Sequence, residues 1–156
     1  MARFQVAPIS PAAVAEAARR LAAGDPAVAL RTVDAPVGYP CRLTLEEAPL
    51  GEQVLLFRYR PFGAVTPYTE EGPIFARLHA APAQLPPGAL PPFMAGRKLV
   101  SVRRYDHAGA IAGAEIVAPE DCAAAIASAL DDPAVECVHV RNAGYGCFLF
   151  RADRAA

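Results

Sequence analysis

Long apolar runs and a secretory leader are both missing from this sequence. No stretch approaches the roughly 20 apolar residues that a membrane-spanning helix requires, and residues 1–6 contain an arginine with no apolar region behind it. These absences argue against a membrane protein and against a secreted one. The sequence therefore predicts a soluble, cytoplasmic protein with no membrane partner.

Neither sign of charge is in clear excess, because the formal net charge at pH 7 is only −1. A chain this close to neutral has no bulk electrostatic attraction to nucleic acid, so we expect no nucleic-acid partner. Tryptophan is absent, and all but one of the 15 basic Lys and Arg residues are arginine. Alanine and proline are also abundant, so GC-rich coding, typical of many bacteria, explains the arginine bias as a whole.

Paired cysteines are lacking too. The four cysteines form no C-x-x-C or C-x-x-H pair, which is the close ligand spacing of structural zinc sites. Phosphate-binding P-loops and the G-x-S-x-G nucleophile motif are absent as well. We therefore predict no metal and no cofactor, and we expect reduced thiols. The cysteines are Cys41, Cys122, Cys137 and Cys147.

What is present indicates one globular domain over residues 1–156. The 54% hydrophobic and 20% charged fractions are those of a folded chain, and 156 residues suffice for a substantial core. The densest run of helix and strand breakers, Pro82 to Pro92, is predicted to be a surface loop within this domain. The oligomeric state stays open.

Two helices are predicted from apolar residues at helical spacing. The first covers residues 11–23, with Ser10 as N-cap, Pro11 at the first helical position and Gly24 after its end. The second covers residues 119–130, and its inward stripe includes Cys122. On that stripe Cys122 is interpreted as a small core residue and not as a nucleophile.

The remaining chain is predicted to form strands joined by short loops. Residues 106–109 and 141–146 have the composition of hairpin turns. We therefore predict an α+β fold: a single mixed, mainly antiparallel sheet with two helices, long Pro-rich loops and the helix at 119–130 covering one face. The predicted strands are 4–7, 27–33, 42–45, 53–59, 74–78, 98–105, 110–117, 134–140 and 147–152.

Several short motifs in a fixed order resemble a known family. The sequence is similar to the bacterial domain-of-unknown-function family numbered 1203, over about residues 35–154. The resemblance implies no activity, since the family is uncharacterised. The motifs are Gly38-Tyr39-Pro40-Cys41-Arg42, Gly51-Glu52-Gln53-Val54-Leu55-Leu56, Tyr59-Arg60-Pro61-Phe62, Pro67-Tyr68, Gly72-Pro73-Ile74-Phe75, Tyr105-Asp106, Asp132-Pro133, Val138-His139-Val140-Arg141-Asn142-Ala143, Cys147 and Asp153-Arg154.

Two clusters contain residue types used in thiol chemistry. Cys41 follows a rigid Tyr39-Pro40 turn beside Arg42, and a neighbouring cation lowers a thiol pKa. His139 and Cys147 lie in one predicted hairpin, and histidine is the usual base for a thiol nucleophile. Strand alternation places His139 on the same strand face as Val135, Cys137 and Arg141. The alternative is that Cys41, His139 and Cys147 are structural.

The alternation of side chains along the predicted strands also places several arginines on sheet faces. If Arg42, Arg58, Arg103 and Arg141 converge, they form a site for a carboxylate or phosphate. His139 and Asn142 would contribute to such a site, and Tyr68 lies in a loop that could close over it. The alternative is a set of solvated arginines on an open sheet face.

Three functions thus stay open from the sequence. The leading hypothesis is a binding domain for a small anionic or polar ligand. It would be lined by Arg42, Arg58, Tyr68, Arg103, His139, Arg141 and Asn142. The second is a thiol-dependent enzyme that uses Cys147 or Cys41 with His139. The third is an interaction module whose sheet pairs with a second copy.

Overall fold

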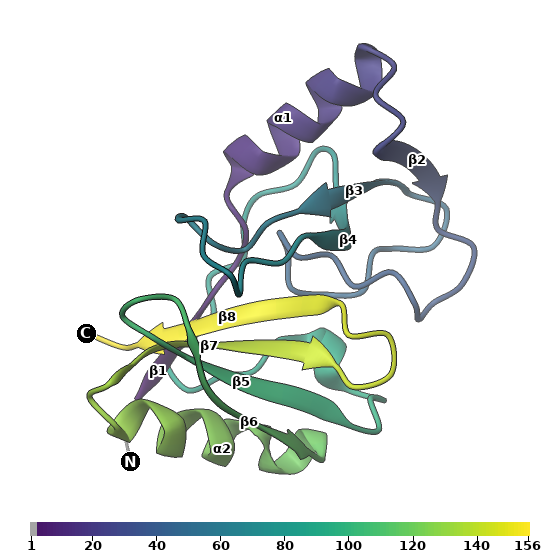
Figure 1. The fold of residues 1–156 in the computed structure, drawn as a ribbon. Helices are drawn as coiled ribbons and strands as arrows, with labels where there is room; N and C mark the ends of the chain where they lie inside the picture. Colours follow the sequence, from purple (N-terminus) through teal and green to yellow (C-terminus); the bar gives the residue numbers. More distant parts are fainter. Residues whose placement is uncertain (1–2) are drawn as a thin grey trace.

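Residues 3–156, which the computed structural model describes, form eight strands and two α-helices (Figure 1). The fold is α+β, as predicted, but the strands form two sheets and not one. The large sheet has the order β1 (Phe4–Ala7), β8 (Phe148–Arg154), β7 (Val135–Asn142), β5 (Val100–Asp106) and β6 (Ile111–Val117). The small sheet has the order β2 (Val28–Thr32), β3 (Gln53–Tyr59) and β4 (Gly72–Arg77).

The division into two sheets follows from the proline-rich loop. After β4 the chain enters residues 82–92, where prolines have no N–H to donate to a sheet ladder. The chain therefore leaves the small sheet, and after the short 3₁₀ helix Pro92–Met94 it re-enters the large sheet, to which β1 already belongs, at β5. All neighbouring strands within each sheet run antiparallel, so neither sheet is mixed, whereas a mixed and mainly antiparallel sheet was predicted.

Each sheet has its own helix. Helix α2 (Pro119–Asp131) packs its buried residues, Cys122 and Ile126 among them, against Val138 and Val140 of β7. This confirms the predicted core position of Cys122. Helix α1 (Pro11–Ala22) packs on the small sheet through Val14. The predicted cap is also confirmed, because the Ser10 side chain accepts a hydrogen bond from the backbone of the first turn.

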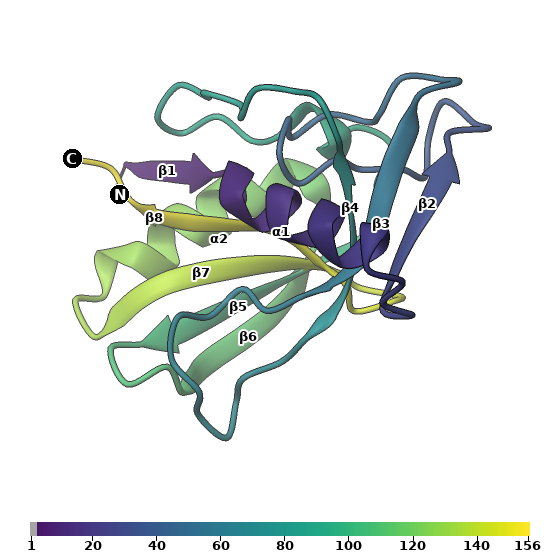
Figure 2. The same cartoon turned by 90° about the horizontal axis from the view of Figure 1, so that it is seen from above.

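The two sheets meet at β8 (Figure 2). The side chain of Phe148 belongs to the apolar cluster of the small sheet, together with Cys41 and Leu43, whereas Leu149 and Phe150 belong to the cluster beneath α2. Phe148 therefore extends from the large sheet into the core of the small one.

The predicted strand at residues 42–45 is wrong, because this segment forms a tight turn. The backbone N–H of Cys41 donates to the carbonyl of Glu46, and that of Leu45 donates to the carbonyl of Cys41. Leu45 closes the turn with φ at 60°, in the left-handed region. Leu45 is fully buried, so burial of its side chain offsets the backbone cost of roughly 1–2 kcal/mol.

Strand β6 is one of the two outer strands of the large sheet, and most of its side chains are exposed. Its Gly113 pairs with Arg104 of β5. The Arg104 guanidinium lies across Gly113, so close that a Cβ at this position would collide with it. A side chain at this position would therefore displace the Arg104 guanidinium from its place over Gly113.

Among residues 3–156, no helix has the length and apolar character needed to cross a membrane.

Candidate functional site

The β7–β8 hairpin positions the central residues of the site. The prediction that the strand of His139 and the strand after Cys147 are neighbours is confirmed. The pairing shifts register between Val140 and Arg141, however, so that Arg141 lies opposite Phe148 and Leu149 is passed over. This irregularity changes which side chains of β7 and β8 lie on the same face of the sheet. It places Phe148 on the His139 side of the sheet, where the two rings lie 5.3 Å apart.

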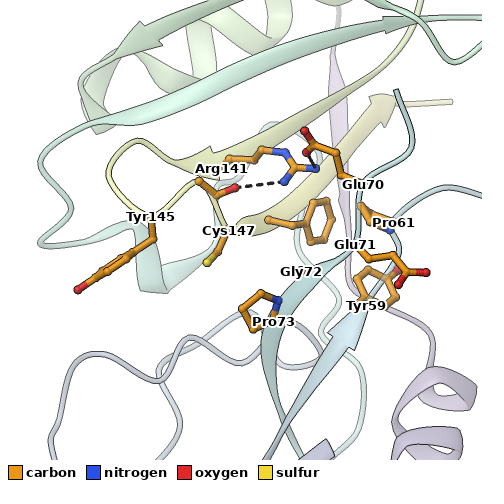
Figure 3. Close-up of a pocket in the computed structure, with 11 residues that line it drawn as sticks. Tyr59, Pro61, Glu70, Glu71, Gly72, Pro73, Arg141, Tyr145 and Cys147 are labelled. Carbon is orange, nitrogen blue, oxygen red and sulfur yellow. Dashed lines mark hydrogen bonds and ion pairs between the residues drawn. The ribbon is translucent and has the colours of Figure 1, made fainter. Parts of the chain in front are cut away.

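Arg141 is buried at the end of β7, with 6% of its surface exposed. Its Nη1 donates to the carbonyl of Gly146 at 3.1 Å, and its Nη2 lies 3.0 Å from Oε2 of Glu70 (Figure 3). The same carboxylate accepts a hydrogen bond from Arg103 at 3.0 Å. Glu70 itself is 45% exposed. Two arginines thus share one counter-ion that water reaches freely.

An open groove of about 380 Å³ lies beside this ion pair. One wall is the β7–β8 turn with Arg141 and Cys147, and the other contains Tyr59, Glu70 and Pro73 (Figure 3). A second hollow of about 220 Å³ shares Tyr145, Cys147 and Pro73 with the groove. Its further lining includes Arg42, Arg97 and Asn142.

Arg42 places another cation at this second hollow. It is 3% exposed, and it donates from Nε to the carbonyl of Phe148 at 2.8 Å and from Nη1 to that of Pro40 at 2.6 Å. Within the described residues it has no ion pair. Burial lowers the pKa of Arg42 to about 10, so the side chain remains charged at neutral pH. Neighbouring Arg97 donates to Oδ1 of Asn142 at 2.8 Å.

His139 is completely buried between aromatic rings. The centroids of Tyr105 and Phe62 lie 4.7 Å and 4.8 Å from its own. Burial, together with the positive charge of Arg141, Arg151 and Arg103, lowers the pKa of His139 to about 3. The imidazole is thus neutral near pH 7. Neither ring nitrogen has a hydrogen-bond partner within residues 3–156, so no cysteine sulfur is hydrogen-bonded to it.

The cysteines differ in accessibility. Cys41 is fully buried, and its sulfur accepts backbone N–H groups from Thr44 at 3.4 Å and Arg77 at 3.3 Å. Burial raises the pKa of Cys122 to about 12 and that of Cys137 to about 11. Cys147 is partly exposed and lies in the wall of both hollows.

The structure brings some predicted residues together and separates others. Arg103 and Arg141 meet at Glu70, and Arg42, Asn142 and Cys147 line the neighbouring hollow. Arg58 instead pairs with exposed Glu71 at 3.2 Å, and Tyr68 is 45% exposed on its loop. Neither lines the groove or the hollow beside it.

Sequence reasoning missed Phe62, Glu70 and Arg97. A signal existed for the first two: Phe62 ends the Tyr59-Arg60-Pro61-Phe62 motif, and Glu70 begins a pair of acids in a turn-rich segment facing strands rich in arginine. Nothing in the local pattern around Arg97 distinguishes it. In the part of the chain that the structure describes, no group of three His, Cys, Asp or Glu side chains is placed to hold a metal ion.

The fold and the site together define a class: a two-sheet α+β protein with an arginine-lined groove where the sheets meet. The chain matches no curated protein and no solved structure. It does match a family model over residues 38–154, and it belongs to that family, DUF1203, described as a protein of unknown function. The matched region begins after β2 and ends at the last residue of β8.

Proposed function

We propose that the protein binds a small anionic ligand, a carboxylate or a phosphate, in the groove beside Arg141. The observation that carries the proposal is the counter-ion arrangement: Arg141 is 6% exposed, yet the only carboxylate paired with it within residues 3–156 is Glu70, which is 45% exposed and shared with Arg103. A carboxylate that is accessible to water and attached to a loop can exchange with an anion from solution.

Electrostatics favour such an exchange. A buried guanidinium needs counter-charge, and its planar donors match a carboxylate or phosphate. Arg42 adds a second buried cation whose partners are neutral carbonyl groups. The groove volume of about 380 Å³ is within the range of small-molecule sites. A ligand larger than a single ion would extend from Arg141 past Cys147 toward Arg42.

A thermal-shift series with acetate, citrate, phosphate and sulfate at fixed ionic strength tests the proposal. Binding should stabilise the folded state by about 2.7 kcal/mol at a ligand concentration one hundred times the Kd. Arg141→Gln should abolish the shift. Arg31→Gln is the matched control, since Arg31 is exposed and, within residues 3–156, its guanidinium makes a hydrogen bond to the carbonyl of Leu30 and no ion pair.

Two results would overturn the proposal. One is the absence of any anion-dependent shift at fixed ionic strength, and the other is an equal shift in the parent and in Arg141→Gln. Either outcome would leave Glu70 as a structural counter-ion and the arginines as part of the packing between the sheets.

A further inference from the structure

Two side chains of one loop cover the polar face of β5 and β7. We name residues 60–71, between β3 and β4, the covering segment. Its Phe62 packs against Tyr105 at 5.0 Å and His139 at 4.8 Å between ring centroids. Its Glu70 lies on Arg103 and Arg141. An aromatic ring and a carboxylate from the same segment thus occupy adjacent parts of one sheet face.

The groups beneath the covering segment have unused hydrogen-bonding capacity. Within the described residues, both ring nitrogens of His139, the hydroxyl of Tyr105 and Nε of Arg141 are buried without a hydrogen-bond partner. A buried polar group without a partner lowers stability relative to a satisfied one. They lie on neighbouring strands, because Arg103 pairs with His139 and Tyr105 pairs with Cys137. Four unsatisfied polar atoms on one sheet face leave hydrogen-bonding capacity for a ligand: Nε of Arg141 for its carboxylate, and the atoms of His139 and Tyr105 for a polar substituent on its ring.

The covering segment is attached to the rest of the described chain by few polar contacts. Apart from Glu70, these are the ion pair between Glu71 and Arg58, which is exposed on both sides, and a long hydrogen bond of 3.4 Å from Thr66 to the carbonyl of Gly109. Other hydrogen bonds of Thr66 and Thr69 stay within the segment. Moving the segment therefore breaks little besides the contacts of Phe62 and Glu70.

Two hollows lie near the start of the covering segment: Phe62 lines one of them, and its neighbour Pro61 lines the groove beside Arg141. The groove of about 380 Å³ contains Arg141, and a hollow of about 170 Å³ contains Phe62, Tyr105 and Cys137. Cys137, His139 and Arg141 follow one another at every second position of β7, so His139 lies between the two hollows. Withdrawal of Phe62 would join them into one cavity over His139.

From these contacts we infer that Phe62 and Glu70 occupy the positions that a ligand would take, and that the site accepts a planar aromatic carboxylate. This inference rests on the proposed anion site and specifies its ligand class. The ligand ring takes the position of Phe62 against Tyr105 and His139, where offset or edge-on aromatic contacts are favourable. The ligand carboxylate takes the position of Glu70 on Arg103 and Arg141, and the covering segment moves aside.

Calorimetry with matched probes tests the inference. Benzoate, phenylacetate and 3-phenylpropionate carry a ring and a carboxylate at increasing separation. Acetate carries only the charge, benzamide only the ring, and cyclohexanecarboxylate has a ring that is not planar. The best aromatic acid should bind about tenfold more tightly than cyclohexanecarboxylate, the factor expected for aromatic ring contacts. It should exceed acetate by more, because acetate has no ring to bury.

Two variants separate the roles of the covering segment. Glu70→Gln removes the competing carboxylate and should tighten the binding of every carboxylate probe roughly fivefold. Phe62→Ala frees the ring position and should tighten the aromatic acids but not acetate. If the alanine variant unfolds, Phe62→Leu replaces it in this comparison, because leucine retains apolar bulk but removes the aromatic ring. Glu115→Gln, on exposed β6, is the control for loss of one carboxylate and should bind like the parent.

The outcomes distinguish this inference from the proposed function. If acetate or phosphate binds in a manner that requires Arg141 but no aromatic acid binds more tightly, the aromatic ligand class is overturned and the anion site stands. If no anion binds even to Glu70→Gln, both are overturned. Aromatic acids that bind equally well to Arg141→Gln would also overturn both, because the carboxylate would then not be at the arginines.

Discussion

A single histidine shows how strongly the aromatic enclosure changes the chemistry of one residue. His139 is fully buried beside Phe62, Tyr105 and Phe148, and burial lowers its pKa to about 3 from the ordinary value of 6.5. Between these two pH values the unfolded chain binds a proton at this position that the folded chain does not bind. The stability that depends on neutral His139 is therefore complete above about pH 6.5 and is lost as the pH falls toward 3.

This linkage predicts the effect of acid on a variant. On lowering the pH from 7 to 4.5, the parent should lose about 2–3 kcal/mol more unfolding free energy than His139→Leu, which has no proton to take up at this site. Urea unfolding at both pH values measures the difference. Replacement of exposed His79 with Gln is the control and should retain the acid sensitivity of the parent. Equal acid sensitivity in the parent and His139→Leu would contradict the assigned pKa.

Secondary elements were predictable where their signals are local. The cap at Ser10 and the strand Gln53–Tyr59 depend on neighbouring residues, and both appear as expected. The register shift after Val140 has no local signal, because a bulge changes which residues share a face without changing the composition of the strand. Alternation along each strand therefore does not show that Phe148 lies against His139.

The same limit explains what was and was not predicted of the site. Alternation placed His139 and Arg141 on one face of their strand and left open whether Arg103 converges with them, and the structure places all three near one another. The positions of Phe62 and Glu70 depend on how a twelve-residue loop (residues 60–71) crosses the sheet, which no short-range pattern encodes. Their pairing with His139 and Arg141 is a tertiary contact.

At the scale of the whole molecule, the chain leaves and re-enters the large sheet. Strand β1 belongs to the large sheet, residues 11–77 build α1 and the small sheet, and β5 to β8 complete the large one. Phe148 packs in the small-sheet cluster, and Arg42 donates to the carbonyl of Phe148 across the junction. These shared contacts indicate that the two sheets unfold together.

Two buried cysteines provide a test of this cooperativity. Cys41 lies in the small-sheet cluster and Cys122 in the cluster beneath α2, and both are fully buried. In a pulsed iodoacetamide experiment across a urea gradient, both should become reactive at the same urea concentration, with labelling read by mass spectrometry. Cys147, being partly exposed, should react without urea and control for reagent activity. Reaction of Cys41 at clearly lower urea would mean that the small sheet opens independently.

The crossing of Arg104 over Gly113 has a consequence for self-association. β6 offers an unpaired backbone edge next to exposed Ile111 and Ile116, and charged side chains discourage another strand from adding to such an edge. Gly113→Val would displace the guanidinium and leave an apolar, β-prone edge. Sedimentation velocity should then detect concentration-dependent oligomers that are absent in the parent and in Gly144→Val, a control in an open turn. By this argument we expect Gly113, through Arg104, to discourage copies of the protein from joining edge to edge.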